Sequence, residues 1–456
     1  MRRLPGWAGR IFTSVAIYLT VAAPAGAETL EEALATAYLN NPTLLASRAE
    51  LRATDELVAQ ALSGWRPTVS VTGEIGREWE DVSGNGGGGD EWRTPRAANL
   101  NITQPLYRGG RTLAATDQAE ALVRAQRATL ASVEQDVLFA TVTAYMDVVR
   151  DQAVLQLTIN NERVLERQLE AARDRFAVGE ITRTDVSQSE SRLALATAQR
   201  IAAEGTLAAS RAAYQEIVGD YPGTLEAPTL QLALPESLEA AVAAATENPV
   251  VLASIFSERA AVEGTDVVFG ELLPRLDLSG DITAQKDAAA RGISSEGVSV
   301  MAQLVIPLYQ SGEVSSRLRE AKQRVSQRRQ QVIEARRRAT QQATAAWEAL
   351  QTALAQIQSF ETQVQAAEIA LEGVRQEAQV GARTVLDVLD AEQELLDAQV
   401  SLVTARRDRV VAAFQLLAAV GRLTARDLAL PVTYYDVEEH YREVRGKWYG
   451  LGQPIE

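Results

Sequence analysis

The stretch VGARTVLDVLDAE, residues 380–392, decides the fold because it occurs twice in the chain. A weaker copy, VGEITRTDV, stands at residues 178–186, so that Gly179 of the first copy matches Gly381 of the second. Each copy lies between two long stretches that are rich in Ala and Gln. A glycine commonly ends a helix, and a following Thr and Asp start a new one. We therefore interpret each copy as the turn of a long helical hairpin.

An internal duplication extends well beyond the two turns. Asn41-Pro42 recurs as Asn248-Pro249, and Pro105-Leu106-Tyr107 recurs as Pro307-Leu308-Tyr309. The matched positions keep their register over long spans, which chance similarity does not do. We predict the following division of the chain: a first structural repeat at 28–232 with a β-hairpin at 67–107, a second at 233–430 with a β-hairpin at 274–309, and a C-terminal tail at 431–456.

The N-terminal segment, residues 1–27, has the features of a secretory signal peptide. Arg2 and Arg3 form a basic start, residues 11–23 are largely apolar, and Ala25-Gly26-Ala27 is a small-residue cleavage site. A membrane anchor is the alternative, but the apolar run is too short for one. By its sequence, no later stretch approaches the roughly 18 apolar residues that a spanning helix needs. We expect an exported chain without a transmembrane helix.

The composition excludes several classes of protein. A net charge of −15 argues against nucleic acid as a partner, and the absence of Cys excludes disulfides, thiol catalysis and a lipid anchor on Cys. The single His, His440, leaves no room for a histidine-based metal site, and we expect its side chain to be solvated in the polar tail. Phosphate-binding glycine loops and nucleophile motifs are missing. We therefore expect no enzyme, no cofactor and no metal.

Four segments change from helical to period-two patterning. Apolar and polar residues alternate on strands near 68–75, 98–103, 276–284 and 298–306, which is typical of membrane β-strands of 10 to 13 residues. A soluble half-buried sheet is the alternative. The polar, Gly-rich segment 81–90 and the segment 286–297 are the predicted hairpin tips, on the outer side of the membrane. Four aromatic residues near strand ends are candidates for an interfacial girdle: Trp79, Trp92, Tyr107 and Tyr309.

Four strands cannot close a membrane barrel, because the smallest barrels have about eight strands. An open edge cannot face lipid, since its amides would lack partners. Several chains must therefore combine their strands. Two, three or four chains would supply about eight, twelve or sixteen strands, and the residues alone do not choose between these numbers.

The helical stretches predict a tall body. Gly110 to Ala177 contains no internal Pro or Gly over roughly 68 residues, or about 100 Å of helix. The matching stretch from Glu313 to Val380 is interrupted only by Gly373. Shorter helices after Pro42 and Pro249 stack with the return helices to nearly match this length. We expect a helical cylinder with the β-strands at one end and the hairpin turns at the other.

These features together resemble the TolC family of outer-membrane channel proteins, over nearly all of the mature chain. The resemblance rests on the two turn motifs, on Gln104-Pro105-Leu106-Tyr107 with Ile306-Pro307-Leu308-Tyr309, and on the signal peptide and duplication. It implies an α+β membrane protein whose hairpins form an α-barrel, with four strands per chain in a twelve-stranded β-barrel of a homotrimer. It implies a site in the outer membrane and periplasm, and export of drugs or secreted proteins. The implied partners are outer-membrane lipid, a periplasmic adaptor and an inner-membrane transporter of the RND, MFS or ABC type.

The resemblance also assigns a periplasmic gate to the turns. Asp387 and Asp390 match paired aspartates that ring the entrance. Arg383 matches an arginine of the constricting network, with Thr384 beside it in the motif. Thr184 and Asp185 match its partners on the other hairpin. The chain has Ala378 where well-known members place a tyrosine. Apart from the resemblance, Asp387 is also explained as an acid favoured at a helix N-terminus.

A periplasmic adaptor is the alternative function, because adaptors also have long helical hairpins. An adaptor would carry one hairpin with compact soluble β-domains, whereas this chain predicts two hairpins interleaved with amphipathic strand pairs. The transported substrate and the partner transporter are not predicted by the sequence.

Overall fold

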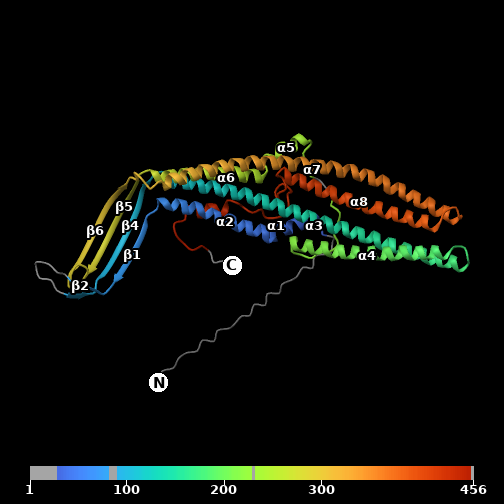
Figure 1. Cartoon of the computed structure of the whole chain (residues 1–456), viewed down its shortest axis with the longest axis horizontal. Helices are drawn as coiled ribbons and strands as arrows, with labels where there is room; N and C mark the ends of the chain where they lie inside the picture. Colours follow the sequence, from blue (N-terminus) through green and yellow to red (C-terminus); the bar gives the residue numbers. More distant parts are fainter. Residues whose placement is uncertain (1–27, 82–89, 229–231, 453–456) are drawn as a thin grey trace, which may run out of the picture.

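The computed structural model describes residues 28–81, 90–228 and 232–452. The molecule is elongated, with a β-sheet at one end and two helical turns at the other (Figure 1). Short helices α1 (Leu30–Asn40) and α5 (Leu238–Ala245) lie near the middle of the long axis. The predicted signal peptide, 1–27, lies outside the described residues.

The first repeat contributes α2 (Pro42–Leu62), α3 (Arg111–Ala177) and α4 (Arg183–Val218). Asn41 caps α2 by accepting from the amide of Thr43 at 3.0 Å, and it also donates to the carbonyl of Ile217 at 2.8 Å. The Asn-Pro motif therefore starts one helix and fixes it against the C-terminal end of another.

The second repeat contributes α6 (Pro249–Phe269), α7 (Glu313–Gln379) and α8 (Val385–Ala419). Asn248 repeats the double role of Asn41, since it accepts from the amide of Val250 at 3.0 Å and donates to the carbonyl of Ala418 at 2.9 Å. α7 continues through Gly373 without a break, because one glycine costs a helix only about 1 kcal/mol.

The sheet has four antiparallel strands in the order β1-β4-β5-β6. Their bounds are β1 (Thr68–Ile75), β4 (Arg96–Arg108), β5 (Arg275–Lys286) and β6 (Ser294–Val305). β1 has eight residues, shorter than predicted, and the chain continues into a separate pair, β2 (Glu78–Asp81) and β3 (Asp90–Arg93). The rest of the predicted tip, 82–89, lies outside the described residues. β1 and β6 form the two edges of the four-stranded sheet.

The strand registers place apolar residues on one face of the sheet and polar residues on the other. Val71, Leu100, Ile282 and Val298 face one another in a row across the four strands, and Val71 and Val298 expose 74% and 76% of their surface. The neighbouring row is polar, with Asn101 donating to Asp281 at 2.7 Å. A sheet that exposes its apolar face is typical of a membrane barrel wall.

Two apolar clusters lie at mid-height of the helical body. The larger one joins α1, α3, α4 and the C-terminal end of α8, and it contains Leu34, Leu138, Tyr145, Tyr214 and Leu417. The second is rich in alanine and joins α5, α6, α7 and α8. Because alanine is small, these helices can approach one another closely.

One stretch corrects our expectation about membrane helices. Leu238–Leu272 contains an 18-residue window with a mean hydropathy of 1.3, long and apolar enough to pass a test for a spanning helix. The structure divides it at Asn248 into α5 and α6. α6 packs against α3 and α7, and its Glu258 pairs with Arg329 of α7 at 3.0 Å. This stretch is therefore part of the helical body.

The tail after Leu430 returns along α2 toward the sheet and contains α9 (Glu439–Val444) (Figure 1). Our expectation that His440 is solvated was wrong. Its Nδ1 lies 3.3 Å from Oδ2 of Asp55, a side chain of α2 that is 1% exposed. Burial raises the pKa of Asp55, while the contact with His440 opposes this shift.

Candidate gate at the hairpin turns

Both predicted turns exist and have the same geometry. Gly179 and Gly381 adopt φ of 81° and 78°, the left-handed region in which a side chain would be strained. The amide of Glu180 donates to the carbonyl of Arg175 at 2.9 Å. In the same way, the amide of Ala382 donates to the carbonyl of Glu377 at 2.9 Å. This bonding pattern satisfies the last carbonyls of α3 and α7 and ends each helix.

A capping box starts each return helix. Asp387 accepts from the amide of Thr384 at 2.9 Å, and the amide of Asp387 donates to the hydroxyl of Thr384 at 3.2 Å. Thr182 and Asp185 form the same pair, with 2.8 Å between the Thr182 amide and the carboxylate. Hydrogen bonds from the threonines lower the pKa of Asp387 and of Asp185. Thr182 was not among the predicted site residues, although the repeat register of Thr384 would have identified it.

The other predicted gate residues are exposed near these caps. Arg383 donates from Nε to Glu377 at 2.8 Å, and this hydrogen bond raises the pKa of Arg383. Thr184 lies in the first turn of α4 with its side chain exposed. Within one chain, the structure does not bring Arg383 to Thr184 or Asp185.

Asp390 connects the two hairpins within one chain. It accepts an ion-paired hydrogen bond from Arg192 of α4, while Asp390 itself is on α8. Arg192 was not predicted, because the two residues are 198 positions apart and no local pattern indicates the pair.

A buried acid lies next to this connection. Glu392 of α8 has a side chain that is 8% exposed, and it accepts from Arg375 of α7 and from Gln168 of α3, the latter at 3.1 Å. A buried carboxylate needs such partners, since an unpaired charge in a low-dielectric site is costly. Glu392 therefore holds three helices together close to the turns.

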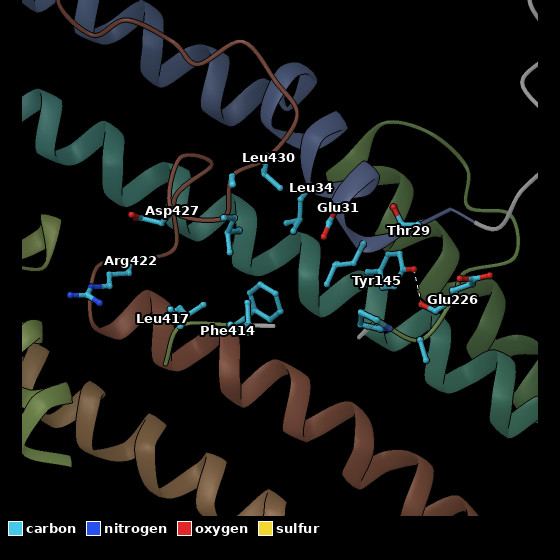
Figure 2. A pocket seen from close by; sticks show the side chains of 17 residues that line it. Thr29, Glu31, Leu34, Tyr145, Glu226, Phe414, Leu417, Arg422, Asp427 and Leu430 are labelled. Carbon is cyan, nitrogen blue, oxygen red and sulfur yellow. Dashed lines mark hydrogen bonds between the residues drawn. The ribbon is translucent and has the colours of Figure 1, made fainter. Parts of the chain in front are cut away.

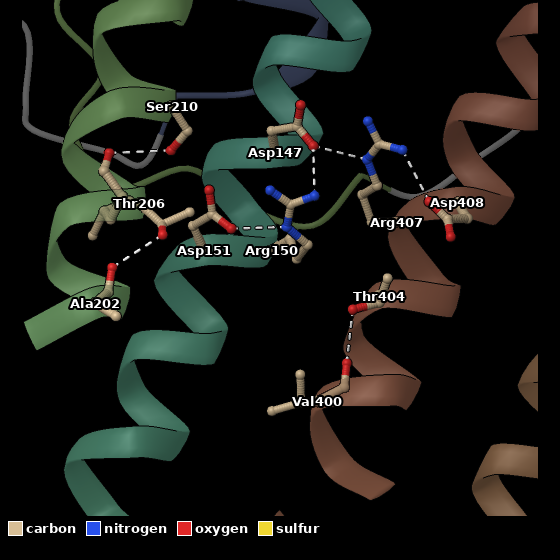
Figure 3. Close-up of polar contacts among 11 residues, drawn as sticks. Asp147, Arg150, Asp151, Ala202, Thr206, Ser210, Val400, Thr404, Arg407 and Asp408 are labelled. Carbon is tan, nitrogen blue, oxygen red and sulfur yellow. Dashed lines mark hydrogen bonds and ion pairs between the residues drawn. The ribbon is translucent and has the colours of Figure 1, made fainter. Parts of the chain in front are cut away.

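A second polar network joins the hairpins nearer mid-height (Figure 3). Arg407 of α8 pairs with Asp147 of α3 at 2.9 Å, and Arg150 pairs with the same acid at 3.0 Å. Arg150 also pairs with the buried Asp151 at 2.8 Å, a contact that raises the pKa of Arg150. Its members are largely shielded from water, so this network is a stronger connection than an exposed pair.

A cavity of about 950 Å³ lies between α1, α3, the end of α8 and the tail (Figure 2). Beside it, the hydroxyl of Tyr145 lies 2.8 Å from the carbonyl oxygen of Glu28 and 2.7 Å from that of Glu226. Burial raises the pKa of Tyr145 to about 12. Tyr214 donates to the carboxylate of Glu28 at 2.6 Å. These contacts fasten the start of the first repeat to α3 and α4, so we regard them as structural.

The fold defines a class of protein. A four-stranded sheet with an exposed apolar face, joined to paired helical hairpins that end in capped turns, is a wall segment of a membrane channel extended by a helical tunnel.

The chain belongs to the outer membrane efflux protein family, whose model matches residues 33–220 and 241–422. It is 36% identical over 433 residues to the outer membrane efflux protein BepC of Brucella suis, covering 94% of this chain and 92% of that one. It is 27% identical to the outer membrane protein TolC of Vibrio cholerae, covering 92% and 96%. The fold also matches the Campylobacter jejuni CmeC outer membrane channel with a TM-score of 0.79 and 14% identity, over 91% of this chain and 89% of that one.

These findings confirm the predicted family, the fold class and the location in the outer membrane. The chain is an outer-membrane exit channel, and its family consists of channel proteins. The two matches of the family model correspond to the two halves of the duplication.

Proposed function

We propose that three copies of this chain form one channel that carries molecules from the inner-membrane machinery, across the periplasm, to the outside. The two free edges of the sheet, β1 and β6, support this proposal, because a membrane barrel has no unpaired edge. Pairing β1 of one copy with β6 of the next gives about twelve strands for three copies.

The proposed division into repeats at 28–232 and 233–430, with a tail at 431–456, fits this arrangement. Each repeat supplies one long hairpin and two strands of the sheet, so three copies would supply six hairpins to the tunnel.

The gate is the site of the proposed regulation. In a trimer, Asp387 and Asp390 would bring about six carboxylates to one narrow opening, where they would attract multivalent cations. Arg383 pairs with Glu377 of its own chain and has a half-exposed side chain, which leaves it able to contact Thr184 and Asp185 of a neighbouring copy. Ala378 supplies no side-chain hydroxyl to this network.

The proposed partners are a periplasmic adaptor and an inner-membrane transporter that supplies the energy. The similarity to BepC, an outer membrane efflux protein, favours efflux as the main role of this chain, with protein secretion as the second candidate.

Single-channel conductance in planar bilayers tests the gate. We expect Asp387→Ala combined with Asp390→Ala to abolish block by trivalent cations and to raise the conductance several-fold. Arg383→Ser should raise the conductance and leave the trivalent block in place. The matched control removes two exposed acids of α7 distant from the turns, Glu334→Ala with Glu348→Ala, and should change neither quantity. Trivalent block that persists in the double aspartate variant would disprove the gate assignment.

A further inference from the structure

A cleft of about 480 Å³ lies where the C-terminal tail meets the start of the sheet. Leu62, Trp65 and Arg66 form one wall, just before β1 begins at Thr68. The other wall comes from the tail and consists of Arg442, Arg445, Gly446 and Trp448. The volume of the cleft is within the range of small-molecule sites in proteins, about 300–1,000 Å³.

The sheet fixes the height of this cleft relative to the membrane. Gln104 of β4 donates to the carbonyl of Trp65 at 2.9 Å, which ties the wall of the cleft to the strand ends. The helical body begins on the same side, so this end of the strands is the periplasmic end. Tyr107 and Tyr309, which are also exposed, lie at the same strand ends. The cleft is therefore at the level of the lipid headgroups in the periplasmic leaflet.

The side chains at the cleft suit that level. Trp65, Trp448 and Tyr449 expose 44%, 67% and 91% of their surface, although large aromatic side chains usually avoid water. Tryptophan and tyrosine collect at membrane interfaces, where the ring contacts the acyl boundary and the polar atom stays hydrated.

Positive charge gathers at the cleft in a chain with a net charge of −15. Arg445 pairs with Glu120 at 3.1 Å, Arg442 pairs with Asp436, and Lys447 lies 3.9 Å from Glu443. Arg66 differs from these. It donates to the carbonyl of Lys447 at 2.6 Å and lies 5.0 Å from the ring centre of Trp448, and no carboxylate pairs with it among the described residues. The excess charge of the cluster therefore resides on Arg66.

We propose that this cleft binds the anionic headgroup of a phospholipid in the periplasmic leaflet of the outer membrane. Arg66 is the main phosphate ligand, since a guanidinium pairs with phosphate through two parallel hydrogen bonds. Trp65 and Trp448 lie against the lipid below the headgroup. The tail thereby becomes a membrane-contact element that fixes the helical body at a set distance from the bilayer.

Native mass spectrometry of the detergent-purified channel tests this proposal. The probes are phosphatidylglycerol and phosphatidylcholine with identical acyl chains. We expect the wild-type channel to bind phosphatidylglycerol about tenfold more tightly, because both lipids carry the same phosphate but the choline cation of phosphatidylcholine offsets the attraction to the arginines. Arg66→Gln should remove this preference. Trp448→Ala should weaken binding of both lipids equally and thereby keep the preference.

Arg337→Gln is the matched control, because it removes one exposed arginine of α7 far from the sheet and should leave the lipid preference unchanged. Helix content by circular dichroism checks that each variant is folded. If Arg66→Gln does not fold, Arg66→Lys replaces it and should weaken the preference, because an ammonium cannot form the two parallel hydrogen bonds of a guanidinium. Equal binding of the two lipids by the wild type would overturn the proposal, as would an unchanged preference in Arg66→Gln at an unchanged oligomer mass. An unchanged preference in Arg66→Gln, with a changed oligomer mass, would assign the cleft to contact between copies instead.

Discussion

Helices α3 and α7 are related by the duplication and both contain 67 residues, yet their surroundings differ. α3 packs against α1, α2, α4, α6 and α8 and has 23 buried residues. α7 packs against α5, α6 and α8 and has ten. The strands show the same contrast, because β4 and β5 have a neighbour on each side while β1 and β6 are at the edges of the sheet.

The difference teaches that the repeat determines the length and ends of an element but not its burial. One chain is a curved wall segment in which elements near its middle, such as α3, β4 and β5, have neighbours on both sides. Elements at its borders, such as α7, β1 and β6, have a neighbour on one side and leave the other side available to another copy. Four predictions test this comparison, from the largest effect to the smallest.

The first prediction compares a core residue of α3 with an exposed residue of α7. Leu138→Ala empties a site that is 0% exposed and should cost about 2–5 kcal/mol of stability. Ile369 is 75% exposed, so Ile369→Ala should lower the stability by less than about 0.5 kcal/mol. Thermal midpoints by circular dichroism measure both. A large effect at Ile369 in the assembled channel would mean that a neighbouring copy covers α7 there.

The second prediction compares two adjacent arginines of α8. Arg407→Ala removes one of the arginines that pair with Asp147 and should lower the stability by about 1–3 kcal/mol. Arg406 makes an exposed pair with Glu361, so Arg406→Ala should cost at most about 1 kcal/mol. Urea unfolding followed by tryptophan fluorescence measures the pair of variants. Equal costs would show that the network at mid-height is no stronger than a surface contact.

The third prediction concerns the two capping boxes, where the repeats agree. Thr182→Ala and Thr384→Ala should each cost about 1 kcal/mol of local stability. Hydrogen exchange of the first turns of α4 and α8 reports on this loss. Thr184→Ala is the control, because its side chain is exposed and makes no cap. A clear difference in exchange between Thr182→Ala and Thr384→Ala would mean that the turns, like the long helices, differ in their surroundings.

The fourth prediction is a pH dependence of the turns. The pKa of Asp387 is lowered below 3.8, so the stability from its cap is fully present above pH 3.8 and is lost as the pH falls through the lower, folded-state pKa. Asp387→Asn should remove this dependence. Channel conductance recorded against pH tests it, with Asp397→Asn on the exposed face of α8 as the control. Identical acid profiles for the wild type and Asp387→Asn would contradict the prediction.

The sequence predicted those features that are local. Gly179 and Gly381 end helices because of their own backbone freedom, Asn41 and Asn248 start helices, and the alternating strands follow from period-two patterning. The pairing of Asp390 with Arg192 and the contact of His440 with Asp55 were missed or wrong, because each joins residues that are far apart in the chain. The gate roles of Asp387, Asp390, Arg383, Thr384, Thr184 and Asp185 remain predictions.

The central pairing of β4 with β5 has a consequence for the order in which the protein folds. Asn101 and Asp281, partners in that ladder, are 180 residues apart, whereas the two strands of the second hairpin, β5 and β6, are close neighbours in sequence. Closing so long a loop is slow compared with forming a helical hairpin. We expect the helices to form first and the complete sheet last. During this interval the apolar faces of β1 and β4 are exposed in water, and exposed apolar surface of this kind favours aggregation until the sheet reaches the membrane.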